Sequence, residues 1–416
     1  MIWRRSFLFA LSALLAACAT GAVEAPSRTQ DAQRDEITIL VSIDGFRPDY
    51  LERGQTPELA RLAAEGVRAS MRPSFPSVTF PNHYTLITGL RPDRNGMINN
   101  RMEDPERPGV VFTLSDRAVA ADPIWWAGAK PLWVSAEQQG VRTATMFWPG
   151  SDYELFGVRP SRWRAFDQTL PGFARVDTLL SWLDAPASER PRFLTLYFDL
   201  VDTAGHRYGP DAPETTAAAA EVDAAIARLT AGLRARGYEG RVNLVIVSDH
   251  GMSAIADDRI VNLDARIDPA VARVIWDGPF AGVAPAAGRE AEAEAALLSA
   301  HAHGQCWRRS DLPARFRFGS HRRVPAIVCL AERGWRYRSS QVSQFPGPNA
   351  GAHGYDNEDP EMAALFIAHG PAFRSGVTLA PFDNVSVYPL LARLTGVRPE
   401  ENDGDLADTA LALLDR

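Results

Sequence analysis

Apolar runs of strand length alternate along the chain with segments in which apolar residues recur at helical spacing. Near-continuous apolar runs are typical of strands that are buried on both faces of a sheet. Strands are predicted over residues 36–43, 193–198, 242–247 and 363–368. Helices are predicted over residues 56–67 and 288–301, with a closing helix over residues 385–396. The alternation predicts an α/β fold with a mostly parallel sheet and helices on both faces.

This pattern weakens between residues 256 and 349, which include an arginine-rich run over residues 307–323. We interpret residues 256–349 as a small inserted subdomain. The main core is then predicted to comprise residues 37–255 and 350–416. We interpret the basic run as solvated surface, with steering of an anionic substrate as the alternative.

The N-terminus has the pattern of an export signal. Arg4 and Arg5 precede a short apolar run and small residues, and residues 1–17 are predicted to be a lipoprotein signal peptide that ends before Cys18. The apolar run is too short for a permanent membrane span. Cys18 is predicted to carry a lipid that anchors an exported, periplasmic protein to a bacterial membrane; the alternative is ordinary cleavage after Ala19 or Ala25. Residues 18–36 are then a tether.

Composition limits the classes of partner, and the cysteine count suggests a disulfide. The chain has 416 residues, is 46% apolar and has a formal net charge of −7, so an electrostatic interaction with polymeric nucleic acid is not expected. Once Cys18 is used or removed, Cys306 and Cys329 remain. In an oxidising compartment we expect them to form a disulfide, worth about 3 kcal/mol in the chain-entropy model. The alternative is two independent buried thiols.

Acidic residues and histidines lie where the predicted strands end, which is where α/β proteins gather functional groups. Taken singly, such an aspartate is usually a helix cap and such a histidine is usually structural. Together they supply six carboxylate or imidazole ligands, which suit zinc and are too many for one tetrahedral ion. The sequence therefore predicts two Zn²⁺ ions. The candidate ligands are Asp44, Asp202, His206, Asp249, His250 and His353.

A two-metal site also needs a nucleophile. Thr79 lies near a probable helix start, where backbone N–H groups stabilise anions, and metal coordination can lower the pKa of a hydroxyl. The alternative is that Thr79 only caps the helix. Ser74 and Ser77 are nearby rivals for the same role.

An ordered set of motifs over residues 37–405 resembles the nucleotide pyrophosphatase/phosphodiesterase family of the alkaline phosphatase superfamily. The motifs are Asp44-Gly-Phe-Arg47, Thr79-Phe-Pro-Asn82, Asn100 within residues 99–105, Phe147-Trp-Pro-Gly-Ser151, Asp202-Thr-Ala-Gly-His206, Asp249-His-Gly-Met252, His353-Gly-Tyr-Asp-Asn357 and Asn384-Val-Ser-Val-Tyr-Pro389. The resemblance implies a three-layer, alkaline-phosphatase-like sandwich. Asn95, where many relatives have histidine, is a minor departure.

The resemblance also implies roles for these residues. One zinc would be held by Asp202, His206 and His353. The other would be held by Asp44, Asp249 and His250, with Thr79 as its fourth ligand and as the nucleophile. Asn100 would donate a hydrogen bond to a phosphoryl oxygen. The reaction implied is two in-line displacements through a phosphothreonine intermediate on Thr79.

The substrate is less well defined than the metal site. Family members divide between nucleotides and choline-bearing lipids, and the superfamily includes monoesterases. Phe80 and Phe166 match the aromatic pair that sandwiches a nucleobase, although Phe166 could instead be a core residue. Arg162 and Arg164 could clamp the extra oxygen of a phosphomonoester.

Two further alternatives are less favoured. A sulfatase is disfavoured, since its Cys/Ser-x-Pro-x-Arg signature is absent around Thr79. A metal-stabilised binding lipoprotein without catalysis is also disfavoured, because every matching position is filled. We therefore predict a nucleotide phosphodiesterase, with phosphomonoesterase and choline-lipid phosphodiesterase as alternatives. The sequence does not specify an oligomeric state.

Overall fold

The computed structural model describes Met1 and residues 36–113, 115–342 and 349–414. The predicted cleavage site, Cys18 with its predicted lipid, and all of the predicted tether except residue 36 lie outside the described residues. Among the described residues, none forms a helix long and apolar enough to span a membrane.

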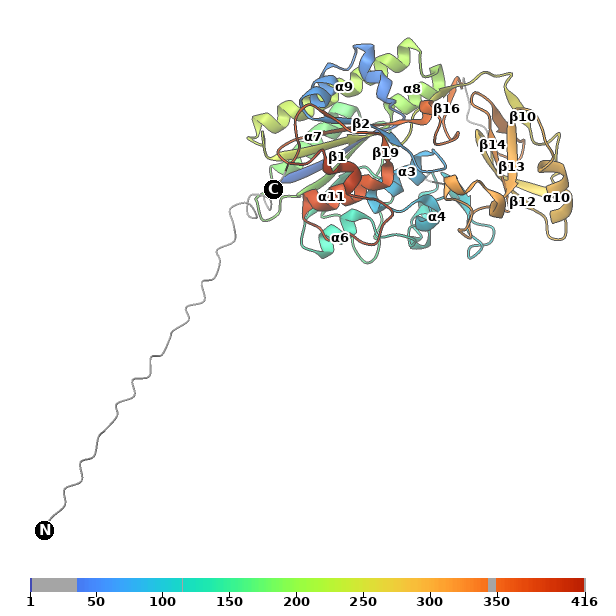
Figure 1. Cartoon of the computed structure of the whole chain (residues 1–416), viewed down its shortest axis with the longest axis horizontal. Helices are drawn as coiled ribbons and strands as arrows, with labels where there is room; N and C mark the ends of the chain where they lie inside the picture. The colour runs from blue at the N-terminus through green and yellow to red at the C-terminus, as the bar shows by residue number, and fades with distance from the viewer. Residues whose placement is uncertain (2–35, 114, 343–348, 415–416) are drawn as a thin grey trace.

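A large mixed sheet lies at the centre of the molecule (Figure 1). Within the described residues it has nine strands, in the spatial order β18 (Val377–Thr378), β2 (Val67–Arg72), β17 (Ala364–His369), β8 (Val242–Val247), β1 (Ile37–Ile43), β7 (Phe193–Phe198), β5 (Thr143–Met146) and β6 (Arg162–Arg164), with β19 (Phe382–Asp383) beside β2. The four predicted strands are the adjacent central strands β17, β8, β1 and β7. Strands β8, β1, β7, β5 and β6 run parallel, which confirms the mostly parallel sheet. Strand β17 is the exception, since it pairs antiparallel with both β8 and β2.

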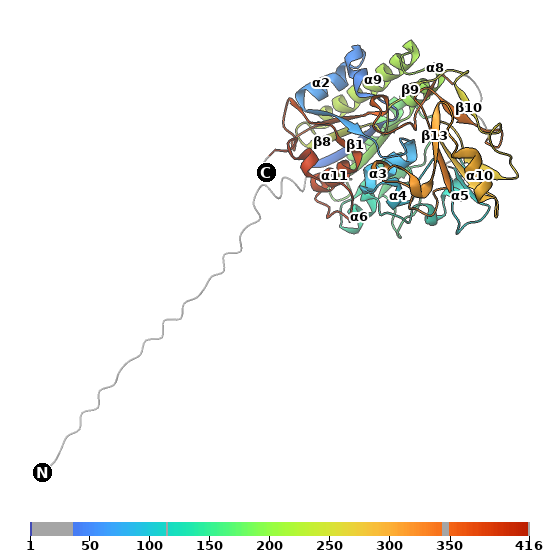
Figure 2. The same cartoon turned by 45° about the vertical axis from the view of Figure 1, so that its right-hand side comes forward.

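Helices cover both faces of this sheet, and every residue of the central strand β1 is buried. In β1, Ile39 and Val41 pack into one hydrophobic cluster and Leu40 packs into the other, as the two-residue period of a strand requires. The first cluster includes residues of α2 (Pro57–Glu65), α7 (Gly172–Leu183), α8 (Leu200–Tyr208) and α9 (Pro213–Ala235). The second includes residues of α3 (Thr79–Thr88), α6 (Leu132–Gln138) and α11 (Val387–Thr395). Figures 1 and 2 show the two helix layers above and below the sheet, so the three-layer α/β prediction is confirmed.

The remaining elements are short. The helices are α4 (Pro92–Asn95), α5 (Arg117–Ala120), α10 (Glu290–Leu297) and α12 (Ala407–Ala410), with 3-10 turns η1 (Pro48–Arg53), η2 (Pro123–Trp125), η3 (Arg309–Asp311), η4 (Ala314–Phe316), η5 (Pro360–Met362) and η6 (Asn384–Ser386). The paired strands are β3 (Arg101–Glu103) with β4 (Val111–Thr113), and β10 (Ile260–Asn262) with β15 (Arg336–Arg338).

A second, antiparallel sheet lies at one end of the molecule, on the right in Figure 1. Its order is β11 (Ala272–Trp276), β12 (Phe280–Pro285), β14 (Ile327–Ala331) and β13 (Gly304–Arg308). The chain leaves the core at β9 (Ser253–Ala254) and returns at β16 (Gly351–Ala352), and these two strands pair with each other. On this basis we propose that residues 256–349 are an insert in a core of residues 37–255 and 350–416.

The second sheet contains the disulfide expected from the sequence. Cys306 on β13 and Cys329 on β14 lie directly opposite each other and are bonded. The alternative of two free thiols is therefore not what the structure shows.

The arginine-rich run joins the second sheet to the core through ion pairs. The Arg323 guanidinium lies 2.6 Å from an Asp104 carboxylate oxygen, and Arg322 lies 2.9 Å from the same oxygen. The Arg323 and Asp104 side chains are 2% and 0% exposed. The interpretation of the whole run as solvated surface is therefore wrong at Arg323, because its charge is buried against an acidic partner.

We expect Asp104→Asn to lower the free energy of unfolding by about 3–5 kcal/mol, because the change leaves a buried guanidinium without its partner. Urea unfolding followed by tryptophan fluorescence measures the effect. Asp177→Asn is the control, since Asp177 pairs with Arg228 at the surface, where about 0–1 kcal/mol is expected. Equal losses in the two variants would contradict the prediction.

The stabilisation by Asp104 should also depend on pH. Burial opposes the charged carboxylate, but hydrogen bonds from Arg322, the Glu106 backbone and Arg323 outweigh it and hold the Asp104 pKa well below 3.8. A lowered pKa in the folded state gives stability that is present above the ordinary pKa and is lost as pH falls through the folded one. The difference between wild type and Asp104→Asn should therefore be constant near neutrality and shrink only in strong acid.

Candidate metal centre and active site

The six candidate ligand residues gather at the carboxyl ends of three adjacent central strands. Asp44 follows β1, Asp202 and His206 lie on α8 after β7, and the pair Asp249 and His250 follows β8. His353 follows β16, so it comes from the loop that re-enters the core after the proposed insert. Parallel strands bring their carboxyl ends to one edge of the sheet, which explains the convergence.

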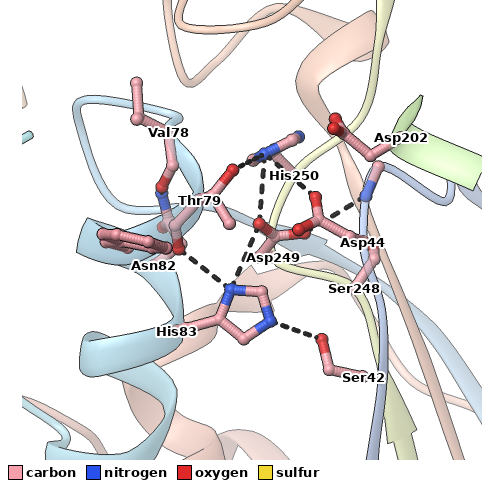
Figure 3. A network of polar contacts seen from close by, with 12 residues as sticks. Ser42, Asp44, Val78, Thr79, Asn82, His83, Asp202, Ser248, Asp249 and His250 are labelled. Atoms are coloured by element: carbon pink, nitrogen blue, oxygen red, sulfur yellow. Dashed lines mark hydrogen bonds and ion pairs between the residues drawn. The ribbon is translucent and has the colours of Figure 1, made fainter. Parts of the chain in front are cut away.

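Asp44, Asp249 and His250 form the first group, and all three side chains are buried (Figure 3). His250 Nε2 lies 3.5 Å from Asp44 Oδ1 and 3.1 Å from Asp249 Oδ2. One ligand atom from each residue lies within 4.8 Å of the others. This spacing would allow the three atoms to share one ion.

Asp202, His206 and His353 form the second group. Asp202 Oδ1 lies 3.5 Å from His206 Nε2 and 3.7 Å from His353 Nε2. The His353 ring stacks on the His250 ring with centroids 3.6 Å apart, so the two groups adjoin. The structure thus brings together all six residues that the sequence singled out.

Backbone carbonyls orient the three histidines. The Nδ1 atoms of His206, His250 and His353 lie 2.8, 2.8 and 3.0 Å from the carbonyl oxygens of Gly351, Gly251 and Ser77. A carbonyl can only accept, so each Nδ1 carries a proton and each Nε2 is left with its lone pair directed at the carboxylates. This is the arrangement in which histidine binds a metal.

The carboxylates share a crowded, buried environment. Burial raises the pKa of Asp44 well above 3.8, and the nearby charges of Asp249 and Asp202 add to the effect. Burial also raises the pKa of Asp202. For Asp249, burial opposes the charged form, but His250 and then His83 outweigh it and hold the pKa well below the ordinary value.

The two histidines that stack on each other, His250 and His353, have pKa values shifted in opposite directions. Burial disfavours the charged form of His250, but the Asp249 carboxylate outweighs burial and raises the His250 pKa. Burial, followed by the charges of His250 and His206, holds the pKa of His353 well below 6.5.

This donor set fits bound cations. Asp44 Oδ1, Asp202 Oδ1 and Asp249 Oδ2 are buried without a hydrogen-bond partner among the described residues, and they are the oxygens that face the histidine nitrogens. Buried carboxylate oxygens without donors are costly unless a positive charge compensates them. Mixed imidazole and carboxylate donors are those that zinc prefers.

Thr79 is the first residue of α3 and points into the first group (Figure 3). Its Oγ1 lies 3.2 Å from His250 Nε2, and the residue is 9% exposed. The loop before it is held by Asn82, whose amide donates to the carbonyls of Pro76 and Val78 at 2.9 Å. These two hydrogen bonds therefore fix the loop that leads into Thr79.

The hydroxyls of Ser74 and Ser77, the rival nucleophiles, donate hydrogen bonds to other residues. Ser74 Oγ donates to Asn384 Oδ1 at 2.9 Å, and Ser77 Oγ donates to the Tyr355 carbonyl at 2.7 Å. Both serines are buried, so Thr79 is the hydroxyl of this loop that contacts a candidate ligand.

Asn100 lies beside the start of α3. Its Oδ1 accepts a hydrogen bond of 2.8 Å from the Phe80 backbone N–H. Since a backbone N–H can only donate, this contact fixes the orientation of the amide and leaves the Asn100 Nδ2 group free to donate to another acceptor. The Phe80 N–H itself is already used by Asn100.

A cavity of about 570 Å³ opens beside Thr79 and Asp44. Of the four predicted substrate contacts, Phe80, Phe166 and Arg164 line this cavity, whereas Asn100 is not among its lining residues. The Phe166 ring is 46% exposed, which contradicts the alternative that it is a core residue. The Arg164 guanidinium makes no hydrogen bond or ion pair with any other described residue, whereas Arg162 does not line this cavity.

Two polar side chains at the site were not singled out from the sequence. Tyr197 donates from its hydroxyl to Asp44 Oδ2 at 2.7 Å. It lies inside an apolar run and so was interpreted only as part of a strand. His83 lies 3.3 Å from Asp249. Its spacing of one helical turn from Thr79 was the signal that could have revealed it.

The fold and these side chains define a class of protein. An α/β sheet presents two adjoining carboxylate–histidine groups and a helix-terminal hydroxyl at one edge. This set of functional groups is typical of a metal-dependent hydrolase.

The comparisons with known proteins identify the family. The sequence model of the family "Type I phosphodiesterase / nucleotide pyrophosphatase" matches residues 38–356, and the chain belongs to this family of enzymes. A pyrophosphatase/phosphodiesterase of Schizosaccharomyces pombe is 37% identical, over 88% of this chain and 78% of that protein.

Animal relatives are similar over much of this chain. Ectonucleotide pyrophosphatase/phosphodiesterase family member 3 of Rattus norvegicus is 35% identical, over 88% of this chain and 42% of its own length. A venom phosphodiesterase of Crotalus durissus collilineatus is 34% identical, over 93% of this chain and 47% of its own length. The chain therefore spans less than half the length of these two relatives.

Solved structures share the fold. Human ectonucleotide pyrophosphatase/phosphodiesterase 5 superposes with a TM-score of 0.86 at 30% identity, covering 91% of this chain and 100% of that one. The murine protein gives the same values in an inactive variant, with threonine replaced by alanine, in complex with AMP.

Proposed function

We propose that the chain is an exported, zinc-dependent phosphodiesterase and nucleotide pyrophosphatase that uses Thr79 as its nucleophile. The observation that carries the proposal is the position of Thr79 Oγ1, 3.2 Å from a candidate ligand histidine and at the wall of the 570 Å³ cavity. The murine relative that is inactive with a threonine replaced by alanine supports a catalytic threonine.

The residues of the first group, together with Thr79, would hold one zinc ion, and those of the second group would hold another. When bound, such ions lower the pKa of a coordinated hydroxyl or water and stabilise charge on phosphoryl oxygens. This chemistry suits Thr79, whose hydroxyl is otherwise a weak nucleophile.

The residues of the chain then perform two displacements. Thr79 Oγ1 passes its proton to solvent and bonds to phosphorus as the bond to the leaving oxygen breaks, which yields a phosphothreonine that still carries the nucleoside. Water then attacks the same phosphorus, the Thr79 oxygen leaves, and it regains a proton. Asn100 donates from Nδ2 to a phosphoryl oxygen in both steps, since Oδ1 is held by the Phe80 N–H.

The cavity favours a nucleotide as the substrate. Phe80 and Phe166 both line it, and a flat base between two rings gains stacking energy with little sequence preference. A structural relative bound to AMP supports this assignment.

We expect Phe166→Ala to lower kcat/KM for the nitrophenyl ester of thymidine monophosphate by about 5–150-fold, equivalent to about 1–3 kcal/mol of lost stacking. The rate on bis-nitrophenyl phosphate, which has no base, should change little. Phe173→Ala is the control, because Phe173 is similarly exposed but does not line this cavity. Equal losses on the two esters would argue against base stacking.

Arg164 favours one alternative function, a phosphomonoesterase. It is a cavity arginine that makes no hydrogen bond or ion pair with the described residues, and a guanidinium suits the extra oxygen of a monoester. Rates on nitrophenyl phosphate and on the nitrophenyl nucleotide diester distinguish the two activities. A strong preference for the monoester that is lost in Arg164→Ala would replace the diesterase assignment.

Export and lipid anchoring through Cys18 complete the proposal. They rest on the signal-like residues 1–17 and on a Cys306–Cys329 disulfide in the structure, which suits an oxidising compartment. Labelled palmitate should be incorporated into the wild type and not into Cys18→Ser. The activity of the Cys18→Ser variant should then be found in the soluble fraction. Equal labelling of the two proteins would exclude the anchor.

A further inference from the structure

His83 lies directly below the candidate metal centre, one turn after Thr79 on α3, and its side chain is fully buried (Figure 3). Its Nδ1 atom is 2.9 Å from the Thr79 carbonyl oxygen and 3.3 Å from Asp249 Oδ2. Its Nε2 atom is 2.8 Å from Ser42 Oγ on β1. One ring therefore contacts the proposed nucleophile, a candidate ligand and the central strand.

The partners determine where the proton of the ring lies. The Thr79 carbonyl can only accept, so His83 Nδ1 carries a proton and donates it to that carbonyl, and the same N–H edge faces Asp249 Oδ2 at 3.3 Å. Nε2 is then the acceptor for the Ser42 hydroxyl. The Nδ1–H is thus hydrogen-bonded to the backbone of Thr79, and the Asp249 oxygen that also faces His250 lies at ion-pair distance from the same nitrogen.

Neighbouring rings prevent His83 from turning away. Trp148 and Tyr197 pack edge-on against it, with centroids 5.0 and 5.2 Å distant. The Trp148 indole also donates to the His83 carbonyl at 3.1 Å. The orientation of the imidazole is therefore set by packing as well as by hydrogen bonds.

We infer that His83 is a positioning residue that fixes the Asp249 carboxylate relative to Thr79, so that the nucleophile and the first metal group keep one geometry. The inference rests on the proposed function for its kinetic consequence. Its structural consequence concerns metal affinity alone. The other carboxylate oxygen, Asp249 Oδ1, accepts only a longer bond of 3.2 Å from the Gly45 N–H. Without His83, Asp249 Oδ2 would lose the ring nitrogen that lies 3.3 Å from it and that also donates to the Thr79 carbonyl.

A matched pair of variants separates positioning from core packing. In His83→Asn, the amide nitrogen occupies the place of Nδ1 and can still donate to Thr79 and Asp249. His83→Leu has nearly the same shape as the asparagine but no donor. Ser42→Ala removes only the contact to Nε2.

In His83→Leu we expect zinc affinity, measured by competition with a chromophoric chelator, to fall by about 10–100-fold for one of two ions. The value of kcat on the nitrophenyl nucleotide should fall by a similar factor. KM should stay within about twofold of wild type, because stacking on Phe80 and Phe166 is untouched. His83→Asn should recover most of both losses, and Ser42→Ala should remain near wild type.

A merely structural role predicts a different pattern. His83→Leu and His83→Asn would then lower the melting temperature together and leave zinc affinity and kcat per folded molecule unchanged. That result, or an asparagine variant no better than the leucine variant, would overturn the inference. If the wild type binds zinc but hydrolyses no diester, the proposed function fails while the chelator titration still decides the role of His83.

Discussion

Thr79→Ala should abolish hydrolysis of nucleotide diesters while both metal sites keep their ions. When a nucleophile and its activating group act as a unit, removal of the nucleophile typically lowers kcat by about 10⁴–10⁶-fold. The ligand set loses one hydroxyl and keeps six carboxylate and imidazole donors, which the structure holds independently of Thr79 through strand ends and backbone carbonyls. Metal content by mass spectrometry and steady-state rates on the nitrophenyl nucleotide measure the two halves of the prediction.

Thr79→Ser is the matched control, because it retains a hydroxyl at the start of α3. It should keep measurable turnover, and acid quenching during turnover should trap the nucleotidyl group (phosphate still esterified to the nucleoside) on residue 79 in the wild type. Thr79→Ala should show neither. Near-wild-type turnover by the alanine variant would remove Thr79 from the mechanism and direct attention to an attacking water.

The metal centre could be predicted because its ligands follow strong local signals. Each of Asp44, Asp202 and Asp249 comes soon after a near-continuous apolar run, and runs of that kind pair as adjacent parallel strands. Strand ends that share one edge converge whatever the intervening loops do. For this reason the sequence predicted the grouping of residues that are more than 150 positions apart, such as Asp44 and Asp249.

Other features depend on partners that no local pattern reveals. The direction of β17 is one, since an apolar run has the same composition whether its strand runs parallel or antiparallel. The burial of Arg323 is another, because it requires Asp104 from a loop more than 200 residues earlier. In the sequence, an arginine in a basic run cannot be distinguished from its solvated neighbours.

His83 and Tyr197 show a third reason for a missed residue. Tyr197 lies in an apolar strand and His83 lies inside a helix, and each contacts another residue of the site without being one of the six candidate metal ligands. Patterns in the chain mark residue types suited to chemistry, whereas positioning depends on contacts. The exposed ring of Phe166 likewise needed the structure, since a phenylalanine near a strand is more often buried.

Removal of bound metal should eliminate hydrolysis and also lower the stability of the protein. Asp44 Oδ1, Asp202 Oδ1 and Asp249 Oδ2 are buried without hydrogen-bond donors, so a chelated protein would keep three close carboxylates uncompensated. An ion that binds only the folded state adds about 4 kcal/mol per site to the free energy of unfolding when its free concentration is 1,000 times its dissociation constant. We therefore expect a lower melting temperature after treatment with a chelator, and recovery of both stability and activity on addition of Zn²⁺.

The recovery should be selective and should depend on pH in a defined direction. Three imidazole nitrogens suit Zn²⁺ better than Mg²⁺ or Ca²⁺, which prefer oxygen ligands, so those ions should restore little. Burial and the charges of Asp249 and Asp202 raise the pKa of Asp44, so protons compete with metal there and zinc affinity should increase as pH rises above 3.8.

Asp202→Asn should reduce the metal content from two equivalents to one, since Asp202 belongs to the second group alone. Full activity in a protein shown by mass spectrometry to contain no metal would refute the metal-dependent mechanism, because the orphaned carboxylate oxygens would then require another source of positive charge.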